Sequence, residues 1–127
     1  MTRLAAFLAL LGVGAAGPVA GTHTVRLDGN SFIPAETRAA PGDTVRFVNG
    51  NGGPHNVMFV ADSIAKDARK AIDAAMPKPK IGEMSSHLLL DPAETYTIVV
   101  PQLGAGRYAF VCLPHQANMR GALVVSP

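Results

Sequence analysis

Short segments in which apolar and polar residues alternate recur along most of the chain, with glycine- or proline-rich turns between them. Alternation with a period of two places every second side chain on one face, so each segment predicts a half-buried β-strand. In Thr22–Leu27, Val25 and Leu27 are expected to point inward. The other predicted strands are Phe32–Ile33, Thr44–Val48, Val57–Val60, Thr95–Val100, Tyr108–Cys112 and Ala122–Val125. Several short strands separated by turn signals predict an all-β sandwich or barrel.

One segment has helical rather than strand periodicity. Between Asp62 and Met76, apolar residues recur at intervals of three and four, and charged residues occupy the remaining positions, which predicts a helix around residues 62–76. Asp62 or Ser63 can cap its N-terminus, and Pro77 ends it. Pro77–Lys80 is expected to be an extended, solvated connector. The pattern as a whole predicts a β-sandwich with one helix inserted between its early and late strands.

The first 21 residues are predicted to be a secretory signal peptide, and residues 22–127 a single domain. Arg3 supplies a positive charge, and Leu4–Ala16 is an apolar run followed by small residues. That run is shorter than the about 20 residues that span a bilayer, although an uncleaved anchor is the alternative. Cleavage after Ala16 or Gly21 would follow small residues, whereas cleavage after Ala20 is disfavoured by a nearby proline.

Charge and cysteine content add two constraints. The formal net charge is +2, and removal of Arg3 with the leader leaves ten basic against nine acidic side chains, a net charge of +1. No block of like charge indicates a nucleic-acid or other electrostatic partner. Cys112 is the only cysteine, so it cannot form an intramolecular disulfide. A free thiol in an oxidising compartment is a liability unless something such as a metal ion occupies it.

Cys112 begins a loop whose residues suit copper. His115 follows three residues later and Met119 four residues after that, and Pro114 stiffens the turn between them. One thiolate, two imidazoles and a weak axial thioether form the ligand set of blue-copper electron-transfer sites. The second imidazole is expected from His55, in a glycine-rich turn that lets the backbone fold closely around an ion. Each residue also has a structural interpretation, as a buried cysteine, loop histidines and a methionine that fills the core.

Three further residues bear on this site. Asn56 is predicted to hydrogen-bond across to the loop that contains Cys112, as an outer brace. His23 and His87 are not expected to be ligands of this centre. His87 flanks an apolar run on a predicted strand, and His23 could chelate Cu(II) only if signal cleavage left a free amine at Gly21.

Three segments together carry a family pattern. They are Pro41-Gly42-Asp43-Thr44-Val45 with Asn49, then Pro54-His55-Asn56-Val57 with Phe59, and Gly106-x-Tyr108-x-Phe110-x-Cys112-x-Pro114-His115-Gln116 with Met119. This combination resembles the cupredoxins, and most closely the plastocyanin-type small blue copper proteins, over essentially the whole of residues 22–127. The resemblance implies an eight-stranded Greek-key β-sandwich. It also implies one type 1 copper ion held by His55, Cys112, His115 and axial Met119, which cycles between Cu(I) and Cu(II).

The chain departs from this pattern in three ways. Three residues separate His115 from Met119 where the plastocyanin-type loop usually has four, which leaves the distance from Met119 to copper open. Val111 stands where plant plastocyanins have a tyrosine, and no acidic patch accompanies it, so that docking face is not expected here. The helix around residues 62–76 is longer than in a minimal plastocyanin.

The leading hypothesis is an exported, periplasmic or otherwise extracytoplasmic electron carrier, monomeric and not an enzyme. In cupredoxins of this kind the C-terminal histidine ligand reaches the surface through an apolar rim, where redox proteins dock. The residues expected to form that rim around His115 are Gly52, Gly53, Leu113, Pro114, Ala117 and Met119, which carry no charge. No nucleic-acid partner and no membrane span in the mature chain are expected.

Two alternatives have other functions. The first is a periplasmic protein that stores or delivers copper. The second is a cysteine hydrolase that uses Cys112 with His55 or His115, which would explain neither Met119 nor the Asn56 brace. Multicopper oxidase or nitrite reductase activity would need additional copper sites that one short domain lacks.

Overall fold

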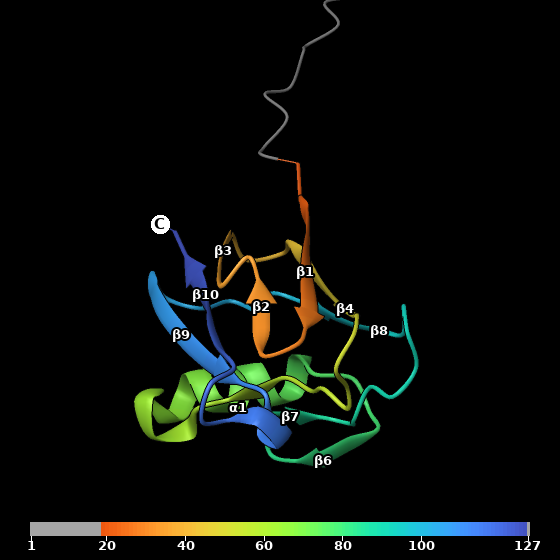
Figure 1. Cartoon of the computed structure of the whole chain (residues 1–127). Helices are drawn as coiled ribbons and strands as arrows, with labels where there is room; N and C mark the ends of the chain where they lie inside the picture. The colour runs from red at the N-terminus through yellow and green to blue at the C-terminus, as the bar shows by residue number, and fades with distance from the viewer. Residues whose placement is uncertain (1–18, 127) are drawn as a thin grey trace, which may run out of the picture.

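The structure, a computed structural model, describes residues 19–126, so most of the predicted signal peptide, residues 1–21, lies outside the described part. The described residues form two β-sheets, one α-helix and two short 3-10 helices (Figure 1). The strands are β1 (Thr22–Asp28), β2 (Ser31–Ile33), β3 (Glu36–Ala39), β4 (Thr44–Asn49), β5 (Met58–Phe59), β6 (Lys80–Gly82), β7 (Ser85–Ser86), β8 (Thr95–Val99), β9 (Gly106–Val111) and β10 (Arg120–Val125). The helices are η1 (Ala61–Ser63), α1 (Lys66–Ala75) and η2 (Leu113–His115).

The two sheets pack face to face as a sandwich. One sheet has the strand order β2-β1-β4-β8, and the other has the order β3-β10-β9-β5-β7-β6. The pairs β1–β4 and β3–β10 are parallel, and the remaining pairs are antiparallel. Parallel pairs arise because the chain crosses from one sheet to the other between β2 and β3, as Greek-key connections do. The prediction of an all-β sandwich is therefore confirmed.

The division into strands is finer than the resemblance implied. Residues 19–126 contain ten strands rather than eight. Three of these strands, β5, β6 and β7, are only two or three residues long. Helix α1 lies between β5 and β6, and a turn lies between β6 and β7. In Figure 1, α1, β6, β7 and the loop after β9 lie at the lower end of the sandwich, opposite the start of β1 and the end of β10.

An aromatic cluster fills the space between the sheets. Phe110 of β9 contacts three other rings edge to face, at centroid distances of 4.8 Å to Phe32, 5.5 Å to Phe47 and 5.6 Å to Phe59. Edge-to-face pairs contribute about 0.5–1.5 kcal/mol each beyond the burial of their area. Because side chains alternate along a strand, Cys112 points to the same side as Phe110, two residues before it. The core therefore fixes the direction in which Cys112 enters the metal-binding region.

The inserted helix starts later than predicted. Helix α1 begins at Lys66, and neither Asp62 nor Ser63 caps it, since both lie in η1 and the Ser63 hydroxyl donates to the Val60 carbonyl at 2.9 Å. Ile64 is extended and buried in the core, so tertiary packing of its side chain interrupts helical geometry at that point. The predicted end is correct, because Met76, the residue before Pro77, leaves helical geometry.

Two other expectations are corrected. The connector Pro77–Lys80 is not fully solvated, because Lys80 begins β6 and its ammonium donates to the Asp73 carboxylate of α1 at 2.7 Å. Strand β3 was not predicted, since its sequence Glu-Thr-Arg-Ala has little β propensity, and it forms by pairing with β10. Within residues 19–126 no helix is long and apolar enough to cross a bilayer.

Candidate metal centre

The predicted ligands come from two loops at one end of the sandwich. Cys112 follows β9 directly, and His115 ends η2, where its N–H donates to the Cys112 carbonyl at 3.1 Å. His55 lies between β4 and β5. It exchanges two backbone hydrogen bonds with Leu89, of 3.1 Å and 2.7 Å. Backbone pairing therefore holds His55 in place, although 57 residues separate it from Cys112.

Three donor atoms from these loops converge. The Cys112 Sγ lies 3.8 Å from Nδ1 of His55 and 3.4 Å from Nδ1 of His115, and all three atoms lie within 4.8 Å of one another. Metal bonds of about 2.0 Å to nitrogen and 2.3 Å to sulfur place these atoms about 3.7 Å apart in a trigonal arrangement. The donors are thus spaced to share one ion, and their soft and borderline character suits copper.

The hydrogen bonding of His55 fixes which of its nitrogens is free. Its Nε2 lies 2.9 Å from the Asn51 carbonyl oxygen, which can only accept. Nε2 therefore carries the proton, and Nδ1 presents its lone pair towards Cys112. His55 and Cys112 are fully buried, whereas His115 is half-buried. Among the three donors, only the His115 ring connects the centre with solvent.

Burial raises the pKa of the Cys112 thiol, although the backbone N–H groups of Asn56 and His115 oppose this effect. Without an ion the sulfur is therefore a neutral thiol at neutral pH, which is a poor nucleophile. This disfavours the hydrolase alternative, because a raised pKa leaves less thiolate available as a nucleophile. A metal ion that binds here must displace the thiol proton.

The predicted brace between the loops is present. Oδ1 of the buried Asn56 accepts a 2.7 Å hydrogen bond from the backbone N–H of Leu113, inside the loop that carries Cys112 and His115. The Asn56 amide nitrogen donates in turn to the Ser85 hydroxyl and to the Ser86 carbonyl of β7. The two serines were not predicted, since nothing in the sequence relates residues 29 and 30 positions away to Asn56.

Met119 closes the same loop. Its N–H donates to the His115 carbonyl at 2.9 Å, and its carbonyl accepts from the N–H of Cys112 at 3.1 Å. Met119 is fully buried, so the expectation that it contributes to an exposed rim is wrong. Its position in the loop agrees with an inward role, and Met76 and Met84 lie in the core elsewhere.

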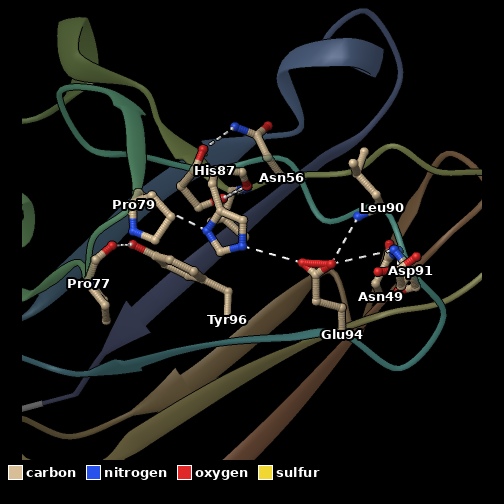
Figure 2. Close-up of polar contacts among 11 residues, drawn as sticks. Asn49, Asn56, Pro77, Pro79, His87, Leu90, Asp91, Glu94 and Tyr96 are labelled. Carbon is tan, nitrogen blue, oxygen red and sulfur yellow. Dashed lines mark hydrogen bonds and ion pairs between the residues drawn. The ribbon is translucent and has the colours of Figure 1, made fainter.

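The other two histidines lie away from this cluster. His23 Nε2 is 2.9 Å from the Asp43 carboxylate, near the start of β1. His87 bridges the Pro79 carbonyl at 3.2 Å and the Glu94 carboxylate at 3.4 Å, with its ring against Tyr96 (Figure 2). His87 lies after β7 rather than within a strand. Within residues 19–126, one cluster of three or more His, Cys, Asp or Glu side chains could hold a metal ion, and it consists of His55, Cys112 and His115.

A two-sheet sandwich that gathers one thiol and two imidazoles at one end defines a small copper-binding protein. Comparison with known proteins agrees, since residues 21–126 match the family described as copper binding proteins of the plastocyanin/azurin family. The chain belongs to this family. Its cofactor is copper, and at this level of description it is a blue copper electron-transfer protein.

Individual relatives support the assignment. The plastocyanin of Vicia faba is 38% identical over 99 residues, which cover 77% of this chain and 90% of that protein. The chloroplastic plastocyanin minor isoform of Arabidopsis thaliana is 38% identical over 96 residues, 75% of this chain and 50% of that protein. An oxidised amicyanin mutant superposes with a TM-score of 0.57 at 25% identity, covering 82% of this chain and 81% of the other. A mutant fern plastocyanin shares the fold, with a TM-score of 0.62 at 24% identity over 81% of this chain and 99% of the other.

Proposed function

We propose that this protein carries single electrons between redox partners outside the cytoplasm, with His55, Cys112 and His115 as copper ligands and Met119 as a weak fourth ligand. The observation that carries the proposal is the convergence of one sulfur and two Nδ1 atoms, with separations of 3.4 Å and 3.8 Å from the sulfur. Bound copper supplies the one-electron couple between Cu(I) and Cu(II).

The chain holds these donors still. His55 is fixed by backbone pairing to Leu89 and by its bond to the Asn51 carbonyl, and Cys112 is fixed by its N–H bond to the Met119 carbonyl. Donors that are locked by packing and by outer hydrogen bonds stay in place when the charge of the ion changes. A site that moves little on changing oxidation state supports fast electron exchange.

His115 is the proposed point where electrons enter and leave. Its half-buried ring lies beside exposed residues that carry no charge, namely Leu113, Pro114 and Ala117. Gly52 and Gly53, which precede His55, are also exposed. Removing water from an uncharged patch costs little free energy. A partner that docks there brings its cofactor close to the His115 imidazole. With a net charge of +1 after removal of the leader, long-range steering is weak, and we expect a monomer that makes small, transient contacts.

The proposed location outside the cytoplasm rests on the N-terminal sequence and on Cys112. The charged and apolar start of the chain has the character of a signal peptide. A single buried thiol among two imidazoles can be protected by an ion in an oxidising compartment, where a free thiol would be oxidised. The periplasm is the compartment we propose.

The test uses a purified protein that consists of residues 22–127, loaded with one equivalent of Cu(II). Its visible absorption is measured through cycles of reduction and oxidation. We expect an intense visible charge-transfer band from the Cys112 thiolate, bleached by a reductant and restored by an oxidant over many cycles. Cys112→Ser should remove the band, and His87→Gln, outside the cluster, should keep it. A colourless complex, or colour that persists in Cys112→Ser, would contradict the ligand assignment.

The storage or delivery alternative predicts a different result. A carrier keeps its ion through repeated oxidation and reduction, whereas a delivery protein releases Cu(I) to a competing chelator. We expect the reduced protein to retain its copper in the presence of a Cu(I) chelator of moderate affinity. The time over which it does so should exceed the time needed for many redox cycles. Rapid loss of the ion on reduction would favour delivery.

A further inference from the structure

The side-chain amide of Asn56 has no unused polar atom. Its oxygen accepts from the Leu113 N–H at 2.7 Å, and its nitrogen donates to the Ser85 hydroxyl at 3.1 Å and to the Ser86 carbonyl at 3.2 Å. Asn56 and Ser86 are fully buried, and Ser85 is nearly so. The loop that carries Cys112 is therefore tied through one amide group to strand β7 in the same sheet.

The partners of this amide allow one orientation only. The Leu113 N–H can only donate, and the Ser86 carbonyl can only accept. If the amide were turned over, its NH₂ group would face the Leu113 N–H, and its oxygen would face the Ser86 carbonyl oxygen. An unsatisfied buried polar group costs about 1–3 kcal/mol. The Ser86 carbonyl on β7 and the Leu113 N–H together require that the oxygen of the Asn56 amide, rather than its NH₂ group, faces the loop.

Strand β7 is itself anchored to α1. The Asp73 carboxylate accepts from the N–H of Met84 at 2.8 Å and from the Lys80 ammonium at 2.7 Å. Met84 is buried with a φ of 52°, a conformation that a residue other than glycine adopts only when its surroundings hold it. The Asp73 carboxylate bonds directly to this strained residue, which immediately precedes Ser85. A continuous path of contacts runs from the inserted helix through β7 to the metal-binding loop.

We propose that Ser85 is a positioning residue of the copper centre, with Asp73 of α1 supporting it from behind. The Ser85 hydroxyl accepts one of the two hydrogen bonds of the Asn56 NH₂ group. It thereby limits movement of the amide whose oxygen holds the Leu113 N–H, and so limits movement of the turn between Cys112 and His115. This inference rests on the proposed function only for the identity of the ligands. The mechanical link itself can be measured in the protein without copper.

The first test is hydrogen exchange in copper-free residues 22–127, measured by NMR on single variants. Loss of one buried hydrogen bond corresponds to about a 5- to 10-fold change in a local opening equilibrium. In Ser85→Ala we expect the Leu113 amide to exchange about 5- to 10-fold faster, relative to core amides of β9. Ser63→Ala, which removes an exposed hydroxyl with only a local bond, should leave Leu113 unchanged. An unchanged Leu113 amide in Ser85→Ala would overturn the proposal.

A shape-matched pair protects this test against a variant that fails to fold. Ser85→Thr retains the hydroxyl, and Ser85→Val has nearly the same volume without it. Leu113 should exchange faster in Ser85→Val than in Ser85→Thr, and equal rates would contradict a role for the hydroxyl. Asp73→Ala should also increase the exchange rate of the Leu113 amide. Asp73→Asn, which keeps an acceptor oxygen, should increase it less. Asp67→Ala, on the same helix and exposed, should have no such effect.

The second readout is spectroscopic and uses the Cu(II)-loaded protein. If Ser85 positions the centre, the charge-transfer band of Ser85→Val should shift or broaden relative to that of Ser85→Thr. A purely structural role would lower stability without moving the band, and that result would overturn the proposal. If no variant, including the wild type, takes up colour, the proposed function fails, while the exchange data still decide whether Ser85 positions the loop.

Discussion

His55 and Leu89 exchange two backbone hydrogen bonds, 3.1 Å from the His55 N–H and 2.7 Å from the Leu89 N–H. This pairing lies outside the named strands, and it holds the backbone of a candidate ligand in place. Leu89 lies between β7 and β8, so this pairing ties the position of His55 to the chain segment that connects those two strands.

Copper binding should release a proton from Cys112. Because burial raises the pKa of this thiol, the sulfur is protonated in the copper-free protein at pH 7 and must lose its proton to bind the ion. Addition of Cu(II) to a weakly buffered solution should release about one proton per site from this residue. The measurement is a pH-indicator titration, with Cys112→Ser as the control that lacks this release. Release of no proton by the wild type would show that the thiol does not bind the ion.

Replacement of Met119 should change the reduction potential more than the affinity for copper. A weak axial thioether contributes little to binding but favours the softer Cu(I). Met119→Gln should lower the potential while the colour persists, as measured by voltammetry and absorption spectroscopy. Met76→Leu, in the core away from the loop, is the matched control. If Met119→Leu changes neither potential nor spectrum, the shortened loop does not present this residue to copper.

A charge placed on the rim should slow electron exchange with the physiological partner. Leu113 is 37% exposed beside His115, so Leu113→Glu would bury a carboxylate at the proposed contact. We expect a several-fold slower exchange, measured by stopped-flow absorption, with the spectrum and potential nearly unchanged and little dependence on salt. Val99→Glu on β8, which is also exposed, serves as a control at a distant edge. A steep dependence on ionic strength with no effect of Leu113→Glu would place docking elsewhere.

Asp43 should stabilise the fold above pH 4 and cease to do so in strong acid. Hydrogen bonds from the Ala40 N–H, from His23 and from the Gly21 N–H lower the pKa of this carboxyl from 3.8 to about 2. A lowered pKa in the folded state gives stability that is present above the unfolded pKa and lost as pH falls through the folded value. The stability difference between wild type and Asp43→Asn should therefore shrink between pH 4 and pH 2 in urea unfolding. A difference that stays constant over this range would refute the linkage.

Gly121 should not tolerate a methyl group. A Cβ there would lie 2.5 Å from the Phe110 ring and 2.7 Å from the Ala35 carbonyl oxygen, and the backbone oxygen cannot move aside easily. Overpacking of this kind costs about 1–3 kcal/mol, so Gly121→Ala should lower the unfolding midpoint in denaturant. At Gly82 an added Cβ meets nothing within 4 Å, and Gly82→Ala should be close to neutral. Equal stability of the two variants would contradict the packing around Phe110.

Local patterns in the sequence determined much of this protein. Alternation predicts that Val25 and Leu27 lie in the core, where both are fully buried. The spacing of Cys112, His115 and Met119 alone indicates a copper-binding loop. These features are readable because strand period and ligand type are set by residues close together in the chain. The Asn56 brace was also predictable, since its neighbour His55 already marked the site.

Only the tertiary structure decided features that depend on distant partners. Strand β3 forms because its backbone pairs with β10. Helix α1 starts at Lys66 because Ile64 packs in the core in an extended conformation. Ser85 and Ser86 acquire a role because pairing of β5 with β7 brings them to Asn56. Long-range hydrogen bonds and burial override weak local preferences, and the sequence of a short segment does not contain the partner that it will meet.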